Sequence, residues 1–380
     1  MVKAIEFPDD LTWLNTQEAL TLEKLKGHVI LLDFWTYCCI NCIHVLKDLK
    51  YLEQKYKEEP FIVIGIHSPK FKNERDIDNI KSAIVRYEIT HPVLADNEMT
   101  LWHEYGINVW PSFLLIDVDG NIIGMTAGEG QRNVLDTAIK HALDEGKKAG
   151  KIVSKKIKIE SDISFDSLLK FPGKLALDSS NQILFVSDSN HNRILAIKLE
   201  DNDIGTILSK IGNGAAGLKD GNYEEAKFNK PQGMVFHNNS LYVADTENHS
   251  IRHIDLINKH VKTIAGTGKQ GFKRDYNGNA LSISLSSPWD LTLVDNHLYI
   301  AMAGIHQIWR LNLNDNTIQN YAGTSKENII DAKLKDAALA QPSGLVYDSS
   351  KNRIYLADSE VSALRYLDLE KGVIKTLIGK

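Results

Sequence analysis

The sequence predicts a two-domain protein in which an α/β sandwich is followed by a β-propeller with four blade units. Strand-like and helix-like segments alternate up to about residue 148, helical periodicity ends near residue 170, and a repeat of short strands follows. At 42.6 kDa the chain is also too long for one ordinary hydrophobic core. We therefore expect an α/β domain over 1–148, a linker or edge strand over 149–169 and a propeller over 170–380.

Hydrophobic runs and helical spacing define the elements of the α/β domain. Val29–Trp35 and Phe61–Ile66 are predominantly apolar runs of the length of buried strands. Between them, apolar residues three or four positions apart predict a helix over Cys42–Tyr56. The turn signal Asp119-Gly120-Asn121 predicts that two antiparallel strands meet there. The remaining expected elements are a helix over Asp76–Tyr87, a strand over Phe113–Asp117, a strand beginning at Ile122-Ile123 and a helix over Val134–Leu143.

From about residue 170 the sequence repeats itself. Pro172, Pro231, Pro288 and Pro342 each open a unit, at intervals of 54 to 59 residues. Each unit offers four strand-like phrases, and the second phrase ends in aspartate in every unit but the third, which has Met302. Four short antiparallel strands per repeat describe a propeller blade, and blades must stack because one blade cannot bury both of its faces.

The repeats resemble the NHL-repeat family over residues 170–380. The likeness is strongest in Tyr242–Arg252, which reads YVADTENHSIR, and in the connecting phrase from Asp220 to Gly233. This resemblance implies a propeller that offers a loop face to a protein partner. We expect the aspartate that ends the second strand to bond to turn amides, which is a structural role.

All three cysteines lie within five positions, at Cys38, Cys39 and Cys42. They follow a buried strand and precede a helix, so they occupy a strand-to-helix junction. A thiol at a helix N-terminus meets unpaired backbone N–H groups and the positive end of the helix dipole, both of which favour the thiolate that attacks disulfides. The cluster therefore indicates thiol chemistry.

Around these cysteines, residues 1 to about 148 resemble the thioredoxin fold. Beyond the Cys39-Ile40-Asn41-Cys42 motif, the likeness rests on Asp33 on the preceding strand, on Trp35, and on the downstream segment Trp110-Pro111-Ser112. It implies a cis peptide bond before Pro111 and a place for that proline opposite the thiols.

The resemblance also implies a catalytic assignment for four residues. Cys39 is the exposed nucleophile, and Cys42, one turn further along the helix, is the resolving thiol. Asp33 accepts a proton from Cys42, helped by a pKa that burial raises, and Pro111 keeps a flat backbone surface for the substrate chain. Cys38 has no assigned task, and we interpret it as a packing residue because adjacent cysteines rarely bridge without strain.

The combination of the two parts resembles the NHL-repeat-containing protein 2 family and its bacterial relatives. Tyr37–Cys42 and the phrase Ala301–Trp309 carry that likeness. The family is expected to have a six-bladed propeller and a further β-rich domain, whereas this sequence ends after four units. We therefore interpret it as a bacterial-type, truncated or naturally short member. Its four blades close, are covered by another chain, or form an arc that the thioredoxin-like domain holds open in part.

A second hypothesis assigns the chain to a different functional class, a redox-inactive interaction scaffold whose thioredoxin-like domain is structural. His191, His249 and His306 are expected at equivalent positions of three blades, along one rim, where turn geometry explains them better than a ligand site. A zinc site is not predicted, because four ligands are needed and only one Cys-x-x-Cys pair is present. No cofactor is expected.

Composition limits the binding partners and the cellular location that we expect. A net charge of −5 gives no reason to expect nucleic-acid binding, and the lysine-rich stretch over 147–158 is interpreted as a solvated linker rather than a basic patch. No secretion signal and no membrane-spanning run are recognised. Three cysteines make no disulfide framework, so we expect a reducing, cytoplasmic location. The sequence does not define the substrate, the electron donor or the oligomeric state.

Overall fold

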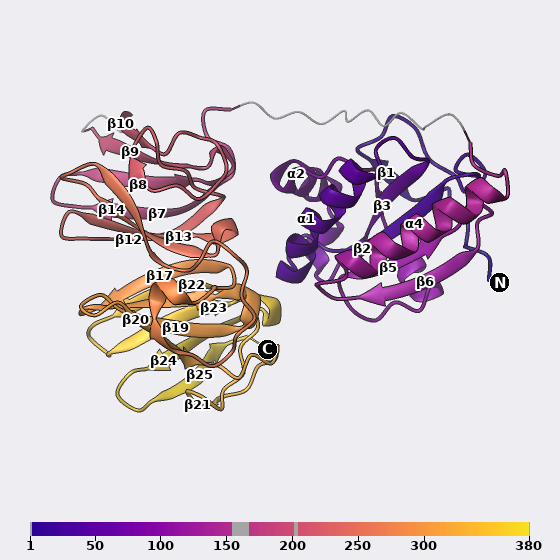
Figure 1. Cartoon of the computed structure of the whole chain (residues 1–380). Coiled ribbons are helices and arrows are strands. Elements are labelled where there is room, and N and C mark those ends of the chain that lie inside the picture. The colour runs from indigo at the N-terminus through magenta and orange to yellow at the C-terminus, as the bar shows by residue number, and fades with distance from the viewer. Residues whose placement is uncertain (1, 154–166, 201–203, 380) are drawn as a thin grey trace. The chain divides into compact units, whose positions relative to one another are not determined.

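The computed structural model describes residues 2–153, 167–200 and 204–379. The chain divides into two compact units, Met1–Phe165 and Asp166–Lys380 (Figure 1). The first unit is α/β and the second consists of four antiparallel sheets, which confirms the predicted fold class. The predicted boundaries at 148 and 170 stay predictions, and most of the linker expected over 149–169 lies outside the described residues.

A mixed six-stranded sheet forms the centre of the first unit. Its strand order is β1-β4-β3-β2-β5-β6, with β2 parallel to β3 and antiparallel to β5. The central strand β2 is buried along its whole length, as its apolar sequence predicts. The strands are β1 (Thr12–Leu14), β2 (Val29–Trp35), β3 (Phe61–His67), β4 (Val93–Ala95), β5 (Ser112–Ile116) and β6 (Ile122–Ala127).

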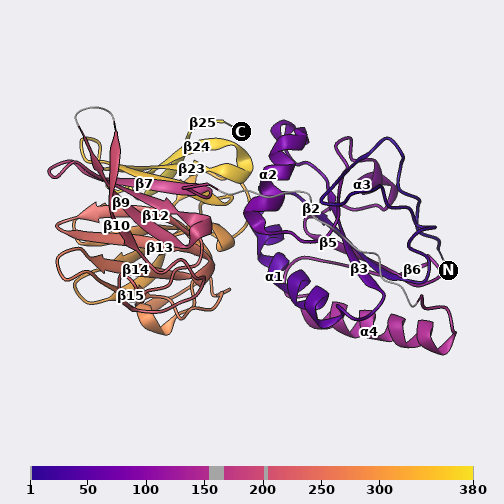
Figure 2. The same ribbon diagram turned by 90° about the horizontal axis from the view of Figure 1, so that it is seen from above.

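Helices cover both faces of this sheet. Apolar residues of α1 and α4 pack with the sheet in one core, and those of α3 and the N-terminal segment pack with it in another. Figure 2 shows α3 and α4 on opposite sides of the sheet. The helices are α1 (Ile40–Lys55), α2 (Ile77–Tyr87), α3 (Thr100–Glu104) and α4 (Arg132–Lys148), with a 3-10 turn η1 (Lys72–Arg75). None of the described helices is both long and apolar enough to cross a bilayer.

The expected elements of this unit are present, with shifted ends. The helix expected from Cys42 begins at Ile40, and the helix expected over Val134–Leu143 extends to Arg132–Lys148. The strand predicted from Ile122 pairs antiparallel with β5, as the turn signal indicated. The short elements β1, β4 and α3 were not predicted, because a segment of three to five residues is too short to show a periodic pattern.

The second unit contains four blades, each an antiparallel sheet whose first strand begins at one of the four predicted prolines. Figure 1 shows the sheets following one another from pink to yellow. The strands are β7 (Pro172–Asp178), β8 (Ile183–Asp188), β9 (Arg193–Leu199) and β10 (Gly205–Ile211); β12 (Pro231–His237), β13 (Ser240–Asp245), β14 (Ser250–Asp255) and β15 (His260–Ala265); β17 (Pro288–Val294), β18 (His297–Met302), β19 (Gln307–Asn312) and β20 (Thr317–Ala322); and β22 (Pro342–Asp348), β23 (Arg353–Asp358), β24 (Ala363–Asp368) and β25 (Val373–Ile378). Short edge strands β11 (Gly221–Asn222), β16 (Asn277–Asn279) and β21 (Ala332–Lys333) complete the second, third and fourth sheets.

A 3-10 turn follows the second strand of every blade and ends in a residue with left-handed backbone. In the first three blades this residue is Asn192, His249 or His306, with φ of 51°, 48° and 54°. His249 Nδ1 accepts the backbone N–H of Ser287 at 3.1 Å, at the start of the next blade. The equivalent bonds run from Lys230 N–H to Asn192 Oδ1 and from Gln341 N–H to His306 Nδ1. The turns of the first three blades are therefore each joined to the blade that follows.

The expected rim of three equivalent histidines is wrong by one position. His191 lies inside its 3-10 turn, whereas His249 and His306 follow theirs, so the residue equivalent to them in the first blade is Asn192. His191 bonds instead to Asp188 of its own blade, at 2.8 Å. Asn192 fills the acceptor role of His249 and His306 with a different side chain, so the matching position in the first blade carries no histidine.

The aspartates that end the second strands have the expected structural role and an additional one. Asp245 accepts the backbone N–H of Asn229 at 2.8 Å, and its second carboxylate oxygen lies 2.8 Å from Arg252 Nη1. Both side chains of this ion pair are fully buried. The fourth blade repeats the arrangement with Asp358 and Arg365.

The third blade replaces both members of the ion pair together. Met302 stands at the aspartate position and Trp309 at the arginine position, and both are buried in the apolar core of that blade. Trp309 Nε1 donates to Gln307 Oε1 at 2.8 Å, so its polar atom is satisfied. The departure at Met302 is thus one half of a paired change from a buried ion pair to an apolar contact.

The outer faces of the first and fourth blades are exposed. Leu175 is 61% exposed, whereas the equivalent Met234 of the second blade is 6% exposed. Ile378 is 65% exposed, whereas the equivalent Ala322 of the third blade is fully buried.

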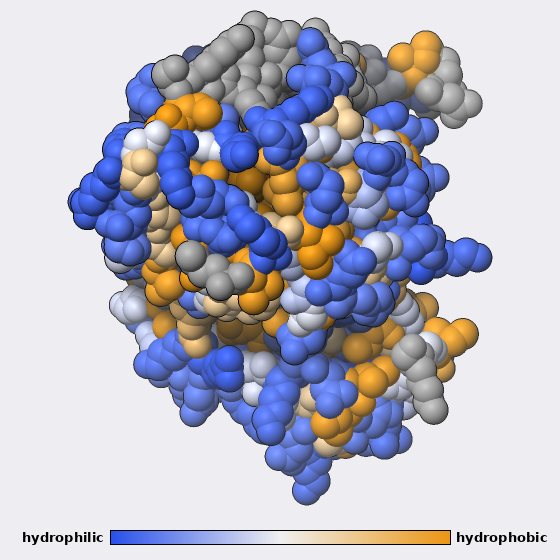
Figure 3. All heavy atoms as spheres, turned by 90° about the vertical axis from the view of Figure 1, so that its right-hand side faces the viewer, coloured by the Kyte–Doolittle hydropathy of each residue, from blue (hydrophilic) through white to orange (hydrophobic). Residues whose placement is uncertain are grey.

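On the face drawn in Figure 3 hydrophilic side chains predominate, and hydrophobic ones form separate patches between them.

Candidate active site

Cys39 is the N-cap residue of α1, where the chain leaves β2 and enters a 16-residue helix. Its backbone is extended (φ −81°, ψ 116°), and the thiol makes no capping hydrogen bond. The expectation that this thiol is exposed is wrong: Cys39 is 6% exposed, because it packs in an apolar cluster with Trp35, Ile80 and Ala83. Cys39 therefore combines a position at the N-terminus of a helix with a largely covered side chain.

Cys42 lies one turn further along α1 and is almost fully buried in the same cluster. Burial raises the pKa of the Cys42 thiol well above its ordinary value, and a hydrogen bond to Cys39 acts in the same direction. A thiol with a raised pKa holds its proton over a wider pH range. The two thiols of the pair are thus placed in different environments.

Asp33 lies on β2 and is completely buried. Neither of its carboxylate oxygens has a hydrogen-bond partner among the described residues. Burial raises the pKa of Asp33 to about 7, and the negative charge of Glu53 adds to this effect while His91 opposes it. The charge of Asp33 acts to raise the pKa of Cys42, as burial does.

The peptide bond between Trp110 and Pro111 is cis, as predicted. Pro111 directly precedes β5, and the pairing of Ser112 with Phe34 places the proline at the end of β2 that leads to the cysteines. The Trp110 ring packs against the cluster that contains Cys39 and Cys42, and its Nε1 donates to Ser68 O at 3.0 Å. Residues of β2, α1 and the turn before β5 therefore meet at one end of the sheet.

Sequence reasoning missed Glu74, a fully buried carboxylate in η1. It accepts hydrogen bonds from Thr36 Oγ1 at 2.5 Å and from the backbone N–H of Cys38 at 3.2 Å. Burial acts to raise the pKa of Glu74, but hydrogen bonds, chiefly from Cys38 and Thr36, outweigh it and leave the pKa below its ordinary value. The backbone N–H groups of Lys70 and Phe71 also donate to it, so Glu74 ties η1 to the segment before Cys39.

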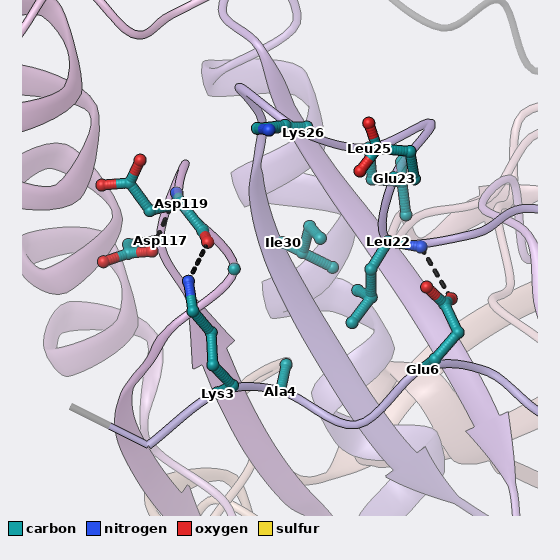
Figure 4. A pocket seen from close by; sticks show the side chains of 11 residues that line it. Lys3, Ala4, Glu6, Leu22, Glu23, Leu25, Lys26, Ile30, Asp117 and Asp119 are labelled. Carbon is teal, nitrogen blue, oxygen red and sulfur yellow. Dashed lines mark hydrogen bonds between the residues drawn. The ribbon is translucent and has the colours of Figure 1, made fainter.

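A separate cavity of about 280 Å³ lies in the same unit, between the N-terminal segment and the turn before β6 (Figure 4). Lys3 Nζ donates to Asp119 O at 2.7 Å on one side, and the backbone N–H of Leu22 donates to Glu6 Oε1 at 2.8 Å on the other. Its walls carry charges of both signs and include none of the residues of the dithiol site. Among the described residues, no three His, Cys, Asp or Glu side chains are grouped to hold a metal ion.

Each of the two units matches a known protein family. Residues 27–122 match the thioredoxin-like family model, and residues 228–254 match the NHL repeat model. The chain is 24% identical over 141 residues to the thiol-disulfide oxidoreductase YkuV of Bacillus subtilis, a match that covers 37% of this chain and 93% of that protein.

Two longer relatives match nearly the whole chain. Over 98% of its length it is 46% identical to the chloroplastic protein SUPPRESSOR OF QUENCHING 1 of Arabidopsis thaliana and 42% identical to NHL repeat-containing protein 2 of Gallus gallus. The chain spans 36% and 54% of the lengths of these two relatives. With a thioredoxin-like domain, an NHL repeat and this similarity, the chain belongs to the NHL repeat-containing protein 2 family.

Proposed function

We propose that this protein is a thiol–disulfide oxidoreductase that uses Cys39 and Cys42. The observation that carries the proposal is the difference between the two buried thiols: Cys39 is the N-cap residue of α1, whereas burial raises the pKa of Cys42, one turn further along the helix. Such asymmetry suits a nucleophile and a resolving thiol. The similarity to a named thiol-disulfide oxidoreductase supports the same reading.

The proposed reaction has two sulfur exchanges. The Cys39 thiolate attacks a substrate disulfide, forms a mixed disulfide and releases the first substrate thiolate. Cys42 then gives its proton to Asp33 and attacks the Cys39 sulfur, which releases the second substrate thiolate and leaves a Cys39–Cys42 disulfide. The substrate gains two electrons and the protein loses them, so an external dithiol has to reduce the pair again. Pro111 is proposed to present its backbone to the substrate chain.

We propose that the propeller serves as a protein-interaction module that brings substrates or partners to the Cys39 and Pro111 surface. The NHL repeat match supports this assignment, and the net charge of −5 does not favour nucleic acid as the partner. Three cysteines with one proposed redox pair fit a reducing compartment, for which we propose the cytoplasm. The functional domains are proposed to span residues 1–148 and 170–380.

One observation favours the alternative of a redox-inactive scaffold: Cys39 is only 6% exposed. Reduction of insulin disulfides by the whole chain distinguishes the two. We expect activity in the wild type and in Cys38→Ser, none in Cys39→Ser, and a trapped mixed disulfide in Cys42→Ser. A wild type that is inactive although its thiols are reduced, or a Cys39→Ser variant with unchanged activity, refutes the oxidoreductase.

A further inference from the structure

Thr36 directly follows β2 and is fully buried at the start of the segment that leads to the cysteines. Its backbone contacts both thiol residues of the proposed pair. The Thr36 carbonyl accepts the backbone N–H of Cys39 at 3.4 Å and closes the turn between β2 and α1. Burial raises the pKa of the Cys42 thiol, and a hydrogen bond from the Thr36 backbone opposes this rise. A displacement of Thr36 would therefore be felt at Cys39 and at Cys42.

A carboxylate from another part of the chain holds this turn. The Thr36 hydroxyl donates to Glu74 Oε1 at 2.5 Å, and the backbone N–H of Cys38 donates to the same oxygen at 3.2 Å. The other oxygen, Oε2, accepts the backbone N–H groups of Lys70 at 2.7 Å and Phe71 at 2.9 Å. Glu74 is thus fixed by its own segment through one oxygen and holds the turn before Cys39 through the other.

Tyr37 lies between the two residues that Glu74 holds and adds two further bonds. Its hydroxyl donates to the carbonyl of Asn73 in η1 at 3.1 Å, and its own carbonyl accepts the hydroxyl of Tyr87, at the end of α2, at 3.1 Å. Although burial acts to raise the pKa of Glu74, its hydrogen bonds lower that pKa, so Thr36 donates to a charged acceptor. Such bonds are roughly twice as strong as those between neutral groups. The Thr36 hydroxyl is therefore a main anchor of the turn.

We propose that Thr36 and Glu74 are positioning residues of the dithiol, which hold the turn before α1 so that the Cys42 sulfur reaches the Cys39 sulfur. The proposal rests on the proposed function and adds residues that act through the backbone of the cysteine segment. In the resolving step the Cys42 sulfur, having given its proton to Asp33, bonds to the Cys39 sulfur. The bond from Cys39 to the substrate sulfur breaks, and the substrate sulfur leaves with its electron pair. A misplacement of reacting groups by about 1 Å can slow such a step about a hundredfold.

The test uses the whole chain in its reduced form and the aromatic disulfide of thionitrobenzoate as the probe. Attack by Cys39 releases one coloured thionitrobenzoate, and resolution by Cys42 releases the second, which Cys42→Ser cannot give. We expect Thr36→Val, which has nearly the same shape without the hydroxyl, to slow the second release about tenfold. Thr36→Ser keeps the hydroxyl, so its second release should be close in rate to that of the wild type.

Two further variants separate positioning from stability. Ser68→Ala removes another buried bond from a hydroxyl to a carboxylate in the same unit, from Ser68 Oγ to Asp96 Oδ2 at 3.2 Å, and should leave the second release unchanged. Glu74→Gln removes the charge that strengthens the bond from Thr36 and should slow the second release. If circular dichroism shows that Thr36→Val does not fold, Glu74→Gln decides in its place.

The positioning role is overturned if the deciding variant resolves as fast as the wild type, or if Thr36→Ser is as slow as Thr36→Val. It is also overturned if Ser68→Ala slows the second release to the same extent. A wild type that gives only the first release refutes the proposed function instead. A wild type that gives both releases, beside a Thr36→Val variant of equal rate, refutes the positioning alone.

Discussion

The Glu74 carboxylate accepts a hydrogen bond from the Thr36 hydroxyl at 2.5 Å, although the two residues are 38 positions apart. Because the same carboxylate accepts the backbone N–H of Cys38, it holds the segment between β2 and α1 from the side of η1. The position of the first thiol therefore depends on a residue outside the Cys-x-x-Cys motif.

Glu74→Gln should destabilise this unit. The amide cannot accept the same set of charge-assisted hydrogen bonds, and such bonds contribute about 1.5–3 kcal/mol each. We expect the free energy of unfolding, measured with urea, to fall by about 2–3 kcal/mol. The pKa of Glu74 is lowered, so its contribution is present above the ordinary glutamate range and is lost as the pH falls through the lowered pKa. The control is Glu98→Gln, since Glu98 forms an exposed ion pair; an equal loss there contradicts the assignment.

Asp33→Asn should stabilise the folded chain in alkaline solution and not in acid. In the unfolded chain Asp33 ionises near its ordinary value of 3.8, whereas burial raises its folded pKa to about 7. Between these values the folded state holds the extra proton, so stability falls as the pH rises and is lowest above pH 7. The difference between variant and wild type should approach zero near pH 4 and reach up to about 4 kcal/mol at pH 8.

Urea denaturation of both proteins at a series of pH values checks this prediction. A constant difference across the range would mean that Asp33 is not protonated in the folded state. Loss of disulfide reduction in the same variant, at unchanged or higher stability, would separate the catalytic role of the carboxyl group from a structural one.

Breaking the Asp245–Arg252 pair should cost more than replacing it. Arg252→Trp alone leaves a buried carboxylate without its partner, which costs about 3–5 kcal/mol. The third blade carries Met302 and Trp309 at the same two positions, so Asp245→Met with Arg252→Trp introduces a combination that this architecture already holds. We expect the double variant to be at least about 1 kcal/mol more stable than the sum of the single changes implies. Additive losses in chemical denaturation would contradict the equivalence of the two arrangements.

His249→Ala should weaken the junction between the second and third blades. The substitution removes the acceptor for the backbone N–H of the buried Ser287, at an expected cost of about 1–3 kcal/mol. His249→Asn should retain most of the stability, because Asn192 performs the same role in the first blade with the same left-handed backbone. Thermal unfolding of both variants decides: equal losses mean that ring packing, not the hydrogen bond, holds the junction.

The sequence predicted the parts of the fold that rest on periodic hydrophobicity. The buried strand over Val29–Trp35, the antiparallel pair that begins at Ile122 and the blades that open at the prolines all have a regular pattern and were found where expected. The shift at His191 had another cause, since its neighbour Asn192 supplies the bonding group that a histidine supplies elsewhere. Chemical equivalence between different side chains is not visible in residue identity.

The site was predictable where a local motif defined it. Cys39, Cys42 and Asp33 are linked by short spacings around one strand and one helix. Glu74 comes from another segment, and its relevance depends on tertiary packing that no local pattern encodes. The burial of Cys39 has the same origin, because the covering residues Ile80 and Ala83 belong to α2.

The bonds from each 3-10 turn to the next blade give the propeller a direction. The acceptor always lies in the preceding blade, at Asn192, His249 or His306, and the donor always lies just before the proline that opens the following one. The second and third blades thus carry one half of a junction on each side, in a fixed polarity. A copy of either middle blade inserted between two others would present the matching acceptor and donor of this bond at both new seams.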